Sequence, residues 1–123
     1  MPSTKLHIYR ESEYDVPLIE WLDSLPNKVQ VKCRVKIERL QQWGSELRRP
    51  EADYLRDGIY ELRIGFQGHH YRILYSFVGK GIVLLSHGIV KESRVPPFEI
   101  DLALQRKNNW ESFPEKHTFT GEI

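Results

Sequence analysis

Apolar positions in the first third of the chain recur at helical spacing. Between residues 14 and 25 they fall at positions 18, 21, 22 and 25, and the next segment places a second stripe at Val29, Cys33, Ile37 and Leu40. This spacing is typical of helices that bury one face. Pro26 lies between the two stretches, and a proline is a strong signal for the end of a helix. The pattern therefore predicts an N-terminal helical hairpin.

The second half of the chain has the composition and spacing of β-strands. Three runs rich in aliphatic and aromatic residues cover 59–65, 69–77 and 82–91, and short glycine-containing turns separate them. Such turns join antiparallel neighbours. A shorter alternating run at residues 5–9 predicts one more strand. A last helix opens at Pro96-Pro97, and its predicted buried side holds Ile100, Ala103 and Leu104.

Together these elements predict an α+β fold. A small antiparallel β-sheet, made of a meander plus the N-terminal strand, is packed by the N-terminal helical hairpin and the C-terminal helix. Residues 1–111 are expected to form a single domain. The periodicity ends at Ser112, so residues 112–123 are expected to be a flexible or partner-docking tail.

The short turns allow the predicted strands to be paired residue by residue. A two-residue turn at Gln67-Gly68 places Arg63 directly opposite Arg72, and a symmetric turn over Gly79-Lys80 places Arg72 opposite His87. A slip of one residue would mix the apolar and polar faces, which supports this register. The expected result is a row of Arg63, Arg72 and His87 across three strands. Further along the same face we expect Glu61, His70 and Lys91.

Two arginines directly opposed in a sheet need a counter-charge. Like charges in this position destabilise a sheet by up to about 1 kcal/mol. Either Glu61 neutralises them on an ordinary solvated face, or the face binds an anion. Guanidinium groups match phosphate oxygens with two hydrogen bonds, and imidazole exchanges protons near neutral pH. The combination favours phosphoryl chemistry on a nucleic acid.

Overall composition narrows the possible classes of protein. Lys and Arg number 18 against 17 Asp and Glu, so only local basic segments, such as residues 28–39, point to a polyanion. The single cysteine, Cys33, allows no internal disulfide, and a reducing cytoplasm is the expected location. No apolar run has the length of a membrane span. No His or Cys lies at metal-ligand spacing, and we expect no cofactor.

Three segments carry a resemblance to a known family: Ile59-Tyr-Glu-Leu-Arg63, Tyr71-Arg-Ile-Leu-Tyr75 and the run from Ile82 to Lys91. Their order and spacing resemble toxins of the RelE/ParE superfamily, most closely its HigB-like, phage-derived branch, over roughly residues 5–110. The resemblance implies the toxin of a type II toxin–antitoxin system, inhibited by a cognate helix-turn-helix antitoxin. It implies a metal-independent endoribonuclease that cuts mRNA on the ribosome. A gyrase-inhibiting toxin and a non-catalytic antitoxin-binding domain remain the alternatives.

The resemblance also implies roles for single residues. Arg63 and Arg72 would hold the scissile phosphate and stabilise its developing charge. His87 would be the general acid or base, with His70 as a weaker substitute. Glu61 would orient the arginines or act as the base. The expected RNA-binding set is Lys91, Glu61, His70 and Arg94.

Overall fold

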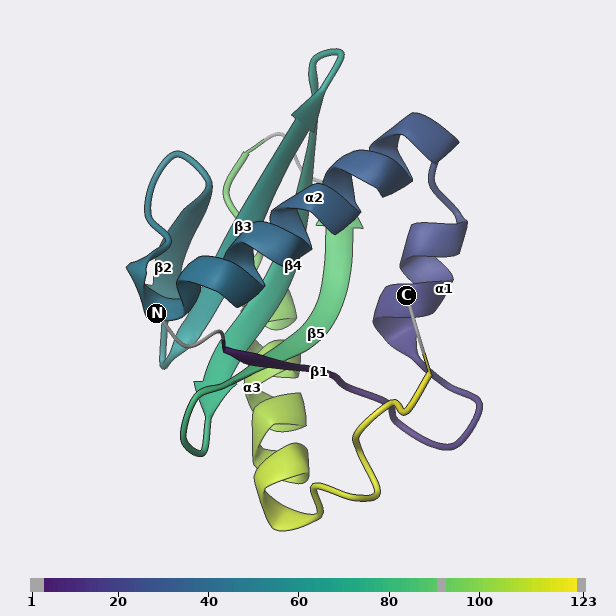
Figure 1. Cartoon of the computed structure of the whole chain (residues 1–123), viewed down its shortest axis with the longest axis vertical. Helices are drawn as coiled ribbons and strands as arrows, with labels where there is room; N and C mark the ends of the chain where they lie inside the picture. Colours follow the sequence, from purple (N-terminus) through teal and green to yellow (C-terminus); the bar gives the residue numbers. More distant parts are fainter. Residues whose placement is uncertain (1–3, 91–92, 122–123) are drawn as a thin grey trace.

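The structure, a computed structural model, describes residues 4–90 and 93–121. In chain order its elements are β1 (Lys5–Ile8), α1 (Pro17–Asp23), α2 (Asn27–Trp43), the short 3-10 helix η1 (Gly44–Glu46), β2 (Ala52–Arg56), β3 (Ile59–Phe66), β4 (His69–Val78), β5 (Ile82–Val90) and α3 (Pro97–Ser112). One sheet separates two helical layers: α1 and α2 lie on one face, and α3 lies on the other (Figure 1). The predicted α+β class is confirmed.

The sheet has five strands in the order β1-β5-β4-β3-β2. The strands from β2 to β5 pair antiparallel, whereas β1 runs parallel to β5. Strand β2 was not predicted, because its segment Ala52-Asp-Tyr-Leu-Arg56 is short, half polar and preceded by Pro50. The pairing with β3 ends at Ala52↔Leu62. The Arg63 amide still donates to the Glu51 carbonyl at 2.8 Å, so residues 64–66 form the open edge of β3.

The helices bury the faces that their spacing predicts. Val29, Cys33, Ile37 and Leu40 of α2 are all buried against the sheet. Helix α1 packs closely on β5, where a Cβ added at Gly88 would lie 2.1 Å from the Trp21 ring. On the other face, Ile100 and Ala103 of α3 pack on apolar residues of β3, β4 and β5. Among the described residues, no helix is both long and apolar enough to cross a membrane.

The register of the first hairpin is confirmed. Arg63 pairs with Arg72 and Ile64 with Tyr71, as the two-residue turn predicts. Gln67 and Gly68 have φ of 50° and 80°, the left-handed backbone that two-residue hairpin turns require.

The predicted register of the second hairpin is wrong. Arg72 pairs with Ile89, and His87 pairs with Leu74. Two features cause the difference. The turn contains three residues, 79–81, so Val78 pairs with Ile82, and a β-bulge at Ser86 shifts the pairing again. Because the two shifts add, His87 stays on the arginines' face but lies two residues away from the predicted position opposite Arg72.

The segment after α3 lies against the start of the chain. Thr118 bridges to Tyr9, the Phe119 amide donates to the Ile8 carbonyl at 2.8 Å, and the His117 ring stacks on Tyr9 with centroids 5.1 Å apart. Phe119 also packs against the main core. The described part of the tail therefore lies against the end of β1 and the two residues that follow it. Its role in partner docking stays a prediction.

Candidate functional site

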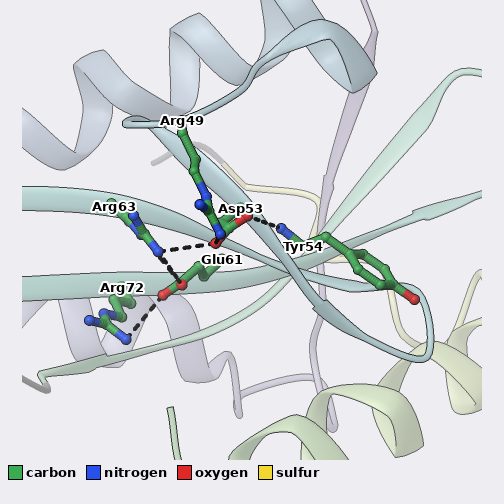
Figure 2. Close-up of polar contacts among 6 residues, drawn as sticks. All are labelled: Arg49, Asp53, Tyr54, Glu61, Arg63 and Arg72. Atoms are coloured by element: carbon green, nitrogen blue, oxygen red, sulfur yellow. Dashed lines mark hydrogen bonds and ion pairs between the residues drawn. The ribbon is translucent and has the colours of Figure 1, made fainter. Parts of the chain in front are cut away.

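Five charged side chains form a chain of ion pairs on the α3-facing side of the sheet (Figure 2). Arg49, just before β2, lies 2.8 Å from Asp53 of β2, and Asp53 lies 3.2 Å from Arg63 of β3. Arg63 lies 3.2 Å from Glu61, and the second oxygen of Glu61 lies 3.2 Å from Arg72 of β4. Three arginines share two carboxylates, so one positive charge is left uncompensated within this cluster.

Glu61 lies between the two arginines and contacts both of them. It is only 2% exposed, and its Oε2 accepts from both Nε and Nη2 of Arg63. Its Oε1 faces Nη1 of Arg72 in an ion pair whose angles fall short of a hydrogen bond. A buried carboxylate without such partners would be strongly destabilising. Glu61 therefore positions both guanidinium groups. Of its two expected roles, orienting the arginines and acting as the base, its burial favours the first.

The outer sides of the two arginines open on a cleft. This basic cleft has a volume of about 600 Å³ and lies at the open edge of β3. It is lined by Lys32, Lys36, Pro50, Glu51, Arg63, Ile64, Gly65, His70, Tyr71 and Arg72. Four of these described lining residues are cationic and one is a carboxylate. The basic cleft is thus suited to a polyanion.

One wall of the basic cleft comes from α2, which the sequence did not assign to the site. Lys36 Nζ lies 3.0 Å from Glu51 Oε1, and Arg39 donates to both oxygens of the same carboxylate. These bonds, led by the one from Arg39, lower the pKa of Glu51 to about 2. Lys32 Nζ lies 5.6 Å from the centre of the Phe66 ring. The signal in the sequence was the basic run at residues 28–39, but only the packing of α2 across β3 brings two of its lysines to the arginines.

The two histidines of the predicted face have different surroundings. His70 lines the basic cleft beside Arg63 and Arg72. His87 is 6% exposed and lies between β5 and α3. Its Nε2 is 3.0 Å from Glu99 Oε1, and its Nδ1 is 2.7 Å from Ser86 Oγ.

The surroundings of His87 favour the neutral form of its imidazole ring. Burial, assisted by the charge of Arg106, lowers the pKa of His87 even though Glu99 acts in the opposite direction. A neutral ring satisfies both contacts if Nε2–H donates to Glu99 and Nδ1 accepts from the Ser86 hydroxyl. His87 therefore joins α3 to the sheet, and it does not line the basic cleft.

The other predicted site residues lie elsewhere. Arg94 is exposed in the segment between β5 and α3, outside the described lining of the basic cleft. Lys91 falls outside the described residues. Within the part of the chain that the structure describes, no group of three His, Cys, Asp or Glu side chains is placed to hold a metal ion.

Comparison with known protein families gives a match. Residues 20–108 match the model of the family described as phage derived protein Gp49-like (DUF891). The matched range runs from α1 into α3 and includes every described residue that lines the basic cleft. A search of curated proteins finds no significant match.

Proposed function

Because this chain belongs to the phage-derived Gp49-like family, a group of RelE/HigB-like toxins, we propose that it is the toxin of a type II toxin–antitoxin system and that it cuts mRNA on the ribosome. The observation that carries the proposal is the basic cleft, where Arg63, Arg72 and His70 share a wall and Lys32 and Lys36 lie on the other side. We further propose that the protein acts in the cytoplasm, where ribosomes and mRNA are found.

The proposed reaction is an intramolecular transesterification. The ribose 2′-oxygen attacks the adjacent phosphorus, the P–O5′ bond breaks, and the products are a 2′,3′-cyclic phosphate and a free 5′-hydroxyl. A base takes the 2′-hydroxyl proton, and an acid gives a proton to the leaving 5′-oxygen. No metal ion takes part in the proposed step.

Arg63 and Arg72 supply the electrostatic part of the proposed mechanism. The negative charge that develops on the phosphorane oxygens falls where two guanidinium groups are already held in place by Glu61. Such preorganised charge is often the largest single contribution to catalysis. Lys32 and Lys36 would hold the phosphates that flank the scissile one.

We assign the proton-transfer role to His70 in preference to His87. His70 lies in the basic cleft, whereas both ring nitrogens of His87 are engaged and the ring is buried. A general acid or base has to reach the proton that it moves, within hydrogen-bond distance or through one water molecule.

We propose that the ribosome holds the mRNA in the geometry that in-line attack requires. The described lining offers charge but no device that bends RNA for in-line attack. Positioning of reacting groups contributes roughly 7–11 kcal/mol in favourable cases. An mRNA held by the ribosome would arrive already positioned.

Single-turnover cleavage of one mRNA tests this proposal. The protein is treated with EDTA and dialysed, and the mRNA is offered either bound in programmed ribosomes or free. We expect rapid cutting only on the ribosome, with cyclic phosphate ends. Equal cutting of free RNA would make the protein a free-standing ribonuclease. No cutting in either case, together with inhibition of DNA supercoiling by gyrase, would favour the gyrase-inhibiting alternative.

A further inference from the structure

A second hollow adjoins the basic cleft on its α2 side. Val31, Lys32, Val35 and Lys36 of α2, with Ile64 and Gly65 of β3, enclose a groove of about 200 Å³, which we call the valine groove. Val31 and Val35 are 57% and 49% exposed. They lie four residues apart and thus on one side of the helix.

The valine groove and the basic cleft form one continuous surface. Lys32, Lys36, Ile64 and Gly65 line both hollows. A chain segment seated on the two valines would therefore touch the same lysines that would hold RNA. An occupant of the groove and an RNA strand in the cleft compete for those lysines.

The chemistry of the surface favours an acidic protein segment as the occupant. Helix α2 carries Lys28, Lys32, Arg34, Lys36 and Arg39 against a single acid of its own, Glu38. Glu51 pairs with Lys36 and Arg39, which leaves the surface with a net positive charge. Two exposed apolar side chains surrounded by cations match a segment with apolar residues in its centre and carboxylates at its sides. RNA matches the cations but not the valines, because unpaired bases stack on aromatic rings.

A second copy of this chain is disfavoured by the same charges. A two-fold symmetric contact would place the valine groove of one copy on that of the other. Such a contact would bring both basic helices together. The described part of the chain's own tail is bound elsewhere, since it bonds to residues 8–10.

We propose that the valine groove is the docking site for an acidic, amphipathic segment of the antitoxin, and that this segment inhibits the toxin by occupying Lys32 and Lys36. The inference rests on the proposed function for the identity of the partner. The segment needs only to cover the valines and reach the lysines, without contact to Arg63 or Arg72.

The test uses purified proteins without ribosomes. The probe is the product of the reading frame adjacent to that of this chain, and its affinity is measured by calorimetry at two salt concentrations. For the variant Val31→Asp/Val35→Asp we expect affinity to fall about tenfold or more, as for residues at the centre of an interface. Val31→Thr/Val35→Thr keeps the shape and adds no charge, and it should cause a smaller loss. Gln42→Asp, which adds one charge at an exposed position of the same helix, is the matched control and should bind as wild type.

A second measurement tests the competition. A fluorescent single-stranded RNA bound to the wild-type chain should be displaced when the antitoxin is added. Simultaneous binding of both would overturn the mechanism of inhibition. If the Asp/Asp variant bound the antitoxin with wild-type affinity, and circular dichroism showed its helix content intact, the proposed docking site would be wrong. Failure of the adjacent product to bind the wild-type chain would also overturn it.

The oligomeric state shows whether the valine groove is a dimer interface instead of a docking site. The cleavage assay shows whether the proposed ribonuclease function fails while the docking site stands. If the wild-type chain forms dimers that the Asp/Asp variant loses, the groove is an interface between copies and the proposal is wrong. If the binding results hold but no RNA is cut on ribosomes, the docking site stands and the proposed ribonuclease function fails. The Asp/Asp variant should keep its toxicity, because neither valine lines the basic cleft. It should also stay toxic when the antitoxin is expressed with it, because the antitoxin then no longer docks.

Discussion

His87 and Glu99 are hydrogen-bonded across the interface between β5 and α3, with 3.0 Å between Nε2 and Oε1. This bond directs the imidazole toward the helix, and the bulge at Ser86 moves it away from the position opposite Arg72. The structural role of His87 and the proposed catalytic role of His70 can therefore be separated by experiment.

We expect His70→Gln to lower the rate of ribosome-dependent cleavage by about 10²–10⁴, the usual contribution of a general acid or base. His87→Gln keeps a polar group beside Glu99 and should leave the rate within a few fold of wild type. Single-turnover rates across pH provide the measurement. If His87→Gln caused the large loss and His70→Gln did not, the assignment made from the sequence would be correct and ours wrong.

The lowered pKa of His87 also predicts how stability depends on pH. The folded protein holds this ring neutral below the pH at which the unfolded chain, with a pKa of 6.5, takes up a proton. The unfolded state then binds more protons, so the free energy of unfolding falls as pH drops through 6.5 toward the lower folded value. Urea unfolding should show a larger decrease in wild type than in His87→Gln. His7, whose pKa is also lowered, is present in both proteins and cancels in the difference. Parallel curves would contradict the burial argument.

Arg72→Ala should abolish growth inhibition and also reduce stability. Its side chain is 13% exposed, and its loss leaves Glu61 Oε1 without an ion pair. A buried acceptor without a partner costs about 1–3 kcal/mol. Adding Glu61→Gln to Arg72→Ala should recover part of the stability but no toxicity. Arg48→Ala, at an exposed arginine that bonds only the nearby Ser45 carbonyl in the described structure, is the control. Full toxicity of Arg72→Ala at equal expression would exclude Arg72 from the phosphate site.

Glu51→Gln should strengthen RNA binding. Glu51 neutralises Lys36 and Arg39 at the rim of the basic cleft, so its loss leaves more positive charge for phosphate. Each additional phosphate contact to a single strand steepens the salt dependence of log K by about 0.7. Fluorescence anisotropy of a short RNA at several salt concentrations measures both changes. In wild type, the Glu51 carboxylate stabilises the fold above pH 4.5, and this contribution is lost as pH falls from 4.5 toward about 2. The variant lacks this contribution, so its free energy of unfolding should be lower above pH 4.5 and should fall less over that range. Unchanged affinity and slope would show that Lys36 and Arg39 do not meet RNA.

Removal of residues 113–123 should destabilise the domain. The truncation exposes Tyr9, which is fully buried, and removes Phe119 from the core. It also removes the bridge between Thr118 and Tyr9 and the hydrogen bond from the Phe119 amide to the Ile8 carbonyl. Thermal unfolding measures the loss, and Lys116→Ala, an exposed change in the same segment, is the control. A truncated chain as stable as wild type would show that the tail is only loosely attached in solution.

The parts of the fold that were predictable are those that local rules determine. The buried stripe of α2 follows from helical spacing, and the Arg63–Arg72 pairing follows from a two-residue turn. The predicted register of the second hairpin was wrong because it assumed a turn of two residues, although Gly79 and Gly81 both adopt positive φ in a turn of three. The bulge at Ser86 leaves no clear mark in the sequence. The charged segment of β2 gave no strand signal either. The approach of Lys32 and Lys36 to the arginines depends on how α2 crosses β3, which a pattern along one chain does not contain.

The parallel pairing of β1 with β5 has a consequence for the order of folding. Lys5 pairs with Ile82, and Tyr9, directly after β1, forms a bridge with Thr118. Contacts between residues so distant in the sequence form slowly, because a long loop must be closed first. Strand β1 therefore pairs only after β5 has been synthesised, and the end of β1 meets its last partner only when residues 117–119 have been made. The residues that line the basic cleft lie between positions 32 and 72, but the sheet that supports them stays incomplete until β5, at Ile82–Val90, has been made and has paired with β1 and β4.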